Sequence, residues 1–141
     1  MKKIILGMAL FFGVSAVAQQ AGPPPDLEIP SNLKQYIVVF LVEEAGKAHD
    51  DPQMMKNHLA FIRKQVEVGK VALVGPFTDH GKIAGMFIMD VPSAEDAQKI
   101  LSDEPMTKAG WVKVEAHPAM LPDLSMVKIV YPPKKPQSFL F

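Results

Sequence analysis

Residues 36–42 are YIVVFLV, an unbroken run of β-branched, aromatic and aliphatic side chains. A strand with one wet face alternates apolar and polar residues, whereas a strand covered on both faces is apolar throughout. The run therefore predicts a strand whose two faces both need a cover.

A helix is predicted after this strand. Asp51 offers an N-cap carboxylate, Pro52 suits the first helical position, and Gly69 stops the helix after Val68. At about 100° per residue, His58 lies about 60° from the centre of the apolar stripe. The stripe consists of Met55, Leu59, Ile62 and Val66. We therefore expect His58 at the edge of the buried face.

Two strands, a second helix and a last strand follow. Residues 71–74 and 83–91 are apolar runs separated by a turn, which predicts a β-hairpin. Ser93, with an acid three residues later, caps a shorter helix that ends before Pro105. Residues 111–116 alternate in polarity, which predicts a half-buried strand.

The resulting order, β-α-β-β-α-β, is the split βαβ or ferredoxin-like motif, an α+β fold with an antiparallel sheet and both helices on one face. The other face is left bare. Because residues 36–42 are apolar on both sides, we expect a second copy of the sheet to cover that face in a homodimer. A further run at 126–131 predicts an extra strand, added to the same sheet or to the partner.

The first 18 residues have the pattern of a cleavable signal peptide. Lys2 and Lys3 precede an apolar stretch, and Ala16-Val17-Ala18 is a small-x-small cleavage site. The stretch is shorter than the ~20 apolar residues of a membrane-spanning helix. We therefore expect an exported protein, periplasmic or secreted, with no membrane segment after cleavage. Residues 19–34, rich in proline, predict an extended linker.

Composition excludes several classes of function. Without residues 1–18 the chain has 13 basic and 15 acidic side chains, so nucleic acid is not an expected partner. It contains no cysteine, which rules out thiol nucleophiles and thiolate metal sites. Neither a glycine-rich phosphate loop nor a paired zinc motif occurs, and we expect no cofactor and no metal.

Six short blocks follow one another between residues 36 and 118. They are HLAFI at 58–62, EVGK at 67–70, GPF at 75–77, GMFI at 85–88, EPMTKAG at 104–110 and HP at 117–118. Their order and spacing resemble the YCII-related domain family. The resemblance covers a domain at 35–118, leaves 119–141 as a C-terminal extension, and implies a dimeric α/β barrel.

The resemblance also implies a catalytic pair, His58 and Glu104. The family carries aspartate where this chain has Glu104, and Asp103, one residue earlier, is the alternative carboxylate. A histidine held by a carboxylate can transfer protons, because imidazole titrates near neutral pH. The alternative is a boundary histidine that makes one structural hydrogen bond.

Three further residues are candidates for a pocket. Arg63 could hold an anionic ligand, Trp111 could line a pocket or the dimer seam, and His117 stands before Pro118 at a predicted strand end. The leading hypothesis is a cofactor-free enzyme that moves a proton on a small organic molecule, in a lyase, isomerase or dehalogenation step. The rival hypothesis is a non-catalytic dimeric module for ligand binding or assembly.

Overall fold

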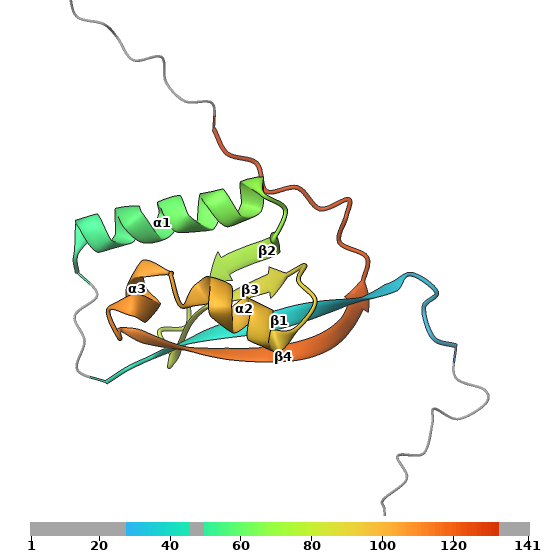
Figure 1. Cartoon of the computed structure of the whole chain (residues 1–141), viewed down its shortest axis with the longest axis horizontal. Coiled ribbons are helices and arrows are strands. Elements are labelled where there is room, and N and C mark those ends of the chain that lie inside the picture. Colours follow the sequence, from blue (N-terminus) through green and yellow to red (C-terminus); the bar gives the residue numbers. More distant parts are fainter. Residues whose placement is uncertain (1–27, 46–49, 133–141) are drawn as a thin grey trace, which may run out of the picture.

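The computed structural model describes residues 28–45 and 50–132. The predicted signal peptide and residues 19–27 of the predicted linker lie outside this part of the chain. The elements in order are β1 (Leu33–Glu43), α1 (Pro52–Glu67), β2 (Val71–Pro76), β3 (Ile83–Met89), α2 (Ala94–Leu101), α3 (Pro105–Lys108) and β4 (Val112–Pro122) (Figure 1). β1 already includes Leu33 and Lys34, the last two residues of the predicted linker.

The four strands form one antiparallel sheet in the order β2-β3-β1-β4. With the helices on one side of the sheet, this is the predicted ferredoxin-like α+β architecture (Figure 1). Strand β4 extends well beyond the predicted residues 111–116, and it pairs with β1 from Leu33↔Pro122 to Glu43↔Val112. β1 lies inside the sheet, between β3 and β4.

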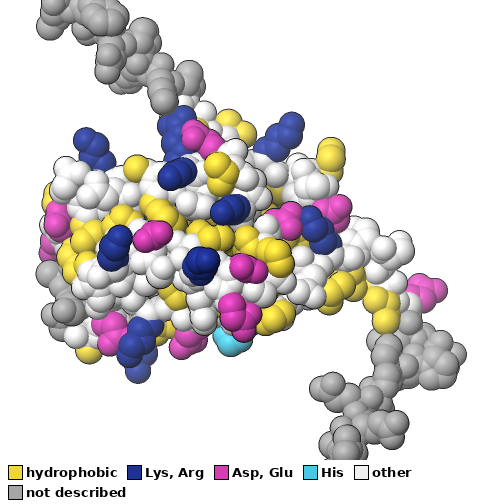
Figure 2. All heavy atoms as spheres, viewed as in Figure 1, with side chains coloured by type: hydrophobic (Ala, Val, Ile, Leu, Met, Phe, Trp, Pro, Cys, Tyr) yellow, Lys and Arg dark blue, Asp and Glu magenta, His cyan; other side chains and the backbone are white. Residues whose placement is uncertain are grey.

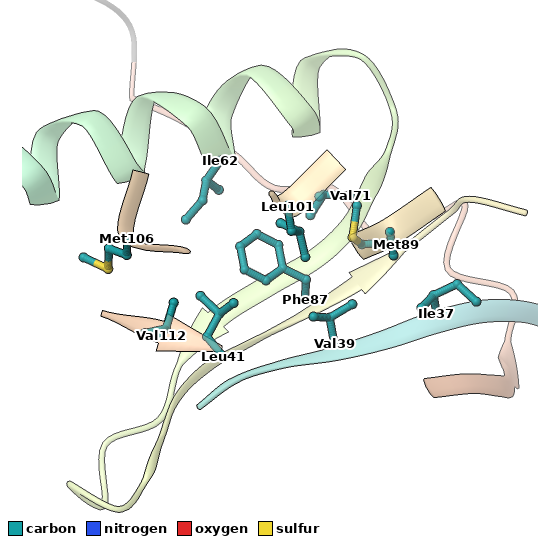
Figure 3. Packing of buried hydrophobic residues seen from close by; sticks show 11 residues of the cluster. Ile37, Val39, Leu41, Ile62, Val71, Phe87, Met89, Leu101, Met106 and Val112 are labelled. Atoms are coloured by element: carbon teal, nitrogen blue, oxygen red, sulfur yellow. The ribbon is translucent and has the colours of Figure 1, made fainter. Parts of the chain in front are cut away.

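The core lies between the sheet and the helices (Figure 3). Alternate residues of β1 and β3 point into it, and Phe87 stands at its centre beneath Ile62 of α1 and Leu101 of α2. The sheet contributes Ile37, Val39, Leu41, Val71, Phe87, Met89 and Val112. Each fully buried side chain of this kind stabilises the fold by about 1.5–3 kcal/mol, so this core fixes α1 and α3 relative to each other.

The predicted apolar stripe of α1 is partly wrong. Met55 is 42% exposed and Leu59 57% exposed, whereas Ile62 and the polar Gln65 are buried. The face that packs on the core also includes Met54, Phe61 and Val66 as partly buried residues. Two neighbouring stripes of α1 both fit the helical period. Because the inward stripe includes polar side chains, the apolar pattern of the sequence did not indicate it. His58 belongs to this inward face and lies closer to the protein interior than expected.

The predicted strand at 126–131 is absent from the single chain, where these residues form an irregular segment. After β4 the chain passes β2 toward the C-terminal end of α1 (Figure 1). The Tyr36 hydroxyl donates to Asp123 Oδ1 at 3.2 Å and accepts from the Leu124 N–H at 2.9 Å. Ile129 then packs against the core. Pairing of the segment with a partner chain stays a prediction.

The opposite face of the sheet has no helix on it within residues 28–45 and 50–132. Its centre is made by two cross-strand pairs, Val38↔Ile88 and Phe40↔Met86. We call these four residues the open-face patch.

On the helix side, basic and acidic side chains are interspersed with apolar ones (Figure 2). No helix of the described residues is long and apolar enough to cross a membrane.

Candidate active site

His58 and Glu104 meet across two helices. His58 lies on α1, and Glu104 is the N-cap residue of α3. The His58 Nδ1 atom is 2.8 Å from Glu104 Oε1, although 46 residues separate them in the sequence. Asp103 does not take this place, because its side chain is 76% exposed and faces Lys108 at 3.5 Å. Of the two predicted carboxylates, Glu104 is therefore the one that contacts the imidazole.

The local sequence positions Glu104. Its extended backbone (φ −66°, ψ 130°) and the following Pro105 begin the one-turn helix α3. The Glu104 carboxylate accepts hydrogen bonds from the backbone N–H groups of Met106, at 2.9 Å, and Thr107, at 2.7 Å. The Thr107 hydroxyl donates to the same carboxylate at 2.9 Å. Glu104 is therefore both the cap of α3 and the partner of His58.

These hydrogen bonds decide the charge of Glu104. The side chain is fully buried, and burial alone would raise the pKa of the carboxyl group. The hydrogen bonds from His58, Met106 and Thr107 outweigh burial and hold the pKa of Glu104 below its ordinary value of 4.5. The group is therefore a carboxylate at neutral pH.

The charge of Glu104 in turn fixes the proton on His58. An ionised carboxylate only accepts hydrogen bonds, so the ring must donate from Nδ1. In the neutral imidazole this leaves the lone pair on Nε2. Within the described part of the chain, Nε2 has no hydrogen-bond partner, and the side chain is 14% exposed. The arrangement leaves Nε2 as the ring nitrogen of neutral His58 that can accept a proton.

Among the described residues, no hydrogen bond or ion pair links Arg63 or His117 to His58 or Glu104. Arg63 forms an ion pair with Glu67 at 3.0 Å and lies over the Tyr131 ring at 4.8 Å. Trp111 lies three residues after the end of α3, donates its backbone N–H to the Met106 carbonyl and packs partly against the core.

His117 was predicted at the end of a strand, but it lies in the middle of β4, opposite Val38. It is exposed, and its ring centroid is 6.3 Å from that of Phe40, a member of the open-face patch. The predicted strand end at His117 is wrong because β4 continues through Pro118 to Pro122. His117 is therefore on the opposite side of the sheet from His58.

Two hollows occur elsewhere on the described surface. The larger, about 370 Å³, lies beside the C-terminal segment and is lined in part by Tyr36, Val71 and Ile129. The smaller lies along α2 and includes Lys99 and Asp103. Neither includes His58 or Glu104. Among the described residues, no three His, Asp or Glu side chains gather in a way that could hold a metal ion.

The model of the YCII-related domain matches residues 36–116, more than half of the chain. The chain belongs to the YCII-related domain family. No curated protein matches this YCII-related chain.

One similar solved structure is that of 5-chloro-2-hydroxyhydroquinone dehydrochlorinase (TftG) from Burkholderia phenoliruptrix AC1100, in complex with 2,5-dihydroxybenzoquinone. Its sequence is 19% identical to this YCII-related chain, and the TM-score is 0.46. The match covers 60% of this chain and 90% of the other.

Proposed function

We propose that this YCII-related protein is a cofactor-free enzyme in which His58 moves a proton on a small organic molecule. The observation that carries the proposal is the hydrogen bond from His58 Nδ1 to the buried, ionised Glu104. Because the proton is fixed on Nδ1, the lone pair is on Nε2 and points in a defined direction. General base catalysis requires a base positioned in this way.

The proposed step is the following. Nε2 takes a proton from a carbon or oxygen of the substrate, and the resulting imidazolium is stabilised by the Glu104 carboxylate. The electron pair left on the substrate forms a new double bond. In a lyase or dehalogenation step, this electron pair displaces a leaving group such as a halide. In an isomerase step, another atom of the substrate takes the proton back from the imidazolium. Glu104 stays ionised throughout, because four donors already occupy it.

A non-catalytic binding or assembly module is the second candidate. The observation in its favour is that Glu104 caps α3 through Met106 and Thr107, so its burial has a structural role without any catalysis. On this account His58 adds one more hydrogen bond to the cap. Both accounts predict that Glu104 stabilises the fold, but only the enzyme predicts a reaction that depends on His58.

The test is proton exchange with a panel of small organic acids and phenols in D₂O. A protein that abstracts a proton from carbon replaces it by deuterium, and the corresponding ¹H NMR signal of the compound disappears. We expect exchange with the wild type and its loss in His58→Ala. The matched control is His80→Asn, since His80 is exposed and its φ of 56° is one that asparagine tolerates.

Two results would contradict the enzyme. Exchange that persists in His58→Ala would remove His58 from the reaction. Binding of a panel compound without exchange in the wild type would favour the non-catalytic module.

We also propose that a second copy of the chain covers the sheet. The open-face patch places four apolar side chains side by side with no helix over them in the described residues. In the single chain Val38, Phe40 and Met86 are half-buried and Ile88 is buried, but an apolar sheet face of this kind without a covering helix is typical of an association surface. A homodimer of sheets packed face to face would bury the patch and complete the predicted dimeric α/β barrel.

Export is a further proposal, supported by the composition of residues 1–18 alone. Expression of the full chain in a bacterial host, followed by mass spectrometry of the exported protein, should give an N-terminus at Gln19. Recovery of the intact Met1 form from the cytoplasm would contradict it.

A further inference from the structure

Thr107 contacts the Glu104 carboxylate at two points. Its backbone N–H is 2.7 Å from Oε2 and its hydroxyl oxygen is 2.9 Å from the same atom. The other oxygen, Oε1, accepts from the Met106 N–H and from His58. Thr107 therefore supplies both donors on the side of the carboxylate that does not face the imidazole.

This division of donors fixes the rotation of the carboxylate. Each oxygen has two lone pairs in the carboxylate plane, and each accepts two hydrogen bonds here. The plane cannot turn without breaking bonds on both sides, so Oε1 stays directed at His58 Nδ1. The hydroxyl of Thr107 is the one donor of the four that belongs neither to the backbone nor to His58.

We propose that Thr107 is a positioning residue of the His58–Glu104 pair, whose hydroxyl holds the carboxylate in the orientation that keeps the proton on His58 Nδ1. The inference rests on the proposed function for its catalytic meaning. Thr107 does not contact the substrate in this scheme. It acts through Glu104, which orients the imidazole, as outer partners of a functional group commonly do.

The first variant is Thr107→Val, which removes the hydroxyl and keeps the backbone N–H that caps α3. The matched variant Thr107→Ser restores a hydroxyl at the same atom. If the valine variant does not fold, Thr107→Ala removes the hydroxyl without placing a methyl group against the carboxylate. Thermal unfolding of each variant establishes that it is folded.

The readout is reaction of His58 with diethylpyrocarbonate, followed by mass spectrometry of the modified peptide. The reagent acylates an unprotonated ring nitrogen: a new N–C bond forms, the anhydride C–O bond breaks, and carbon dioxide and ethanol leave. Only the form with the proton on Nδ1 presents a lone pair at Nε2, away from Glu104. The exposed residues His80 and His117 serve as internal references in every sample.

We expect His58 to react several-fold more slowly in Thr107→Val than in the wild type, with Thr107→Ser at the wild-type rate and the two reference histidines unchanged. For any compound that exchanges in D₂O, we expect the exchange rate constant at saturation to fall about tenfold with KM unchanged. An unchanged His58 rate in folded Thr107→Val, or a serine variant that reacts as slowly as valine, would overturn the inference.

The acylation rate does not depend on the enzyme activity. If His58→Ala is active, the proposed function is wrong. The effect of Thr107 on the acylation rate of His58 would still stand as a structural finding. An unchanged Thr107→Val rate together with an inactive His58→Ala variant would instead overturn the role of Thr107 alone.

Discussion

The imidazole of His58 donates from Nδ1 to Oε1 of Glu104 across 2.8 Å, and this bond joins α1 to the first turn of α3. The same carboxylate satisfies the two free backbone donors at the start of α3. One buried glutamate thus links helix capping to the orientation of a histidine. The contribution of Glu104 to stability and its contribution to chemistry can be separated by experiment.

Removing the Glu104 side chain should destabilise the protein strongly. In Glu104→Ala the N–H groups of Met106 and Thr107, the Thr107 hydroxyl and His58 Nδ1 all lose their acceptor. Leaving such buried donors without a partner should lower the free energy of unfolding by about 3 kcal/mol. Urea unfolding at neutral pH measures it. Asp103→Ala, at an exposed neighbour, should change it by about 0.5 kcal/mol at most.

Stability should also depend on the ionisation of Glu104. Its pKa in the folded protein lies below the ordinary value of 4.5, because hydrogen bonds from His58, Met106 and Thr107 outweigh the effect of burial. The folded state therefore favours the ionised form. The stabilisation is fully present above the unfolded-state pKa and is lost as the pH falls through the folded-state pKa.

Glu104→Gln should accordingly show a shallower loss of unfolding free energy than the wild type below pH 4.5. Urea unfolding at a series of pH values compares the two, with Asp103→Asn as the control for removal of one exposed carboxylate. Parallel curves for the wild type and Glu104→Gln would contradict the assigned shift.

A charge placed in the open-face patch should separate the predicted homodimer. Phe40 is a partly buried member of the patch, and Phe40→Lys would place an ammonium group between the two sheets. Light scattering coupled to size exclusion should give a dimer for the wild type and a monomer for this variant. Leu59→Lys, on the exposed face of α1, should stay dimeric. A monomeric wild type would contradict the proposed association.

The Tyr36 hydroxyl should hold the start of the C-terminal segment. In Tyr36→Phe the Leu124 N–H loses its acceptor and Asp123 Oδ1 keeps only the Ser125 N–H, so the free energy of unfolding should fall by about 1 kcal/mol. Tyr131→Phe is the control, because it keeps the ring that lies beneath Arg63. Equal stability of the Tyr36 variant and the wild type would show that this contact contributes nothing.

Local sequence signals were sufficient for the order of the elements. The cap at Asp51, the stop at Gly69, where φ is 74°, and the cap at Ser93 are all found where predicted. Each is a local interaction that depends on a few neighbouring residues. The ferredoxin-like topology followed from that order.

Tertiary contacts decide the features that local signals did not predict. Residues 126–131 have the composition of a strand but form none in the single chain, where the bonds from Tyr36 to Asp123 and Leu124 hold the start of the C-terminal segment. Pairing of these residues with a partner chain stays a prediction. The inward face of α1 includes Gln65, whose burial no apolar pattern could indicate.

The candidate site was predictable only in part. The family resemblance paired His58 with Glu104, whereas helical periodicity placed His58 only at a boundary. Thr107 was missed, because its contact with Glu104 depends on the backbone geometry of a helix four residues long. A hydroxyl residue three positions after a capping acid is the signal that could have found it.

The most direct test of the central claim is the ¹⁵N NMR spectrum of the His58 ring in the wild type and in Glu104→Gln. The two ring nitrogens have distinct shifts when one carries the proton, so the spectrum reports the tautomer. We predict that neutral His58 in the wild type is protonated at Nδ1, and that this preference is lost in Glu104→Gln. Protonation at Nε2 in the wild type would contradict the claim that Glu104 presents Nε2 as a base.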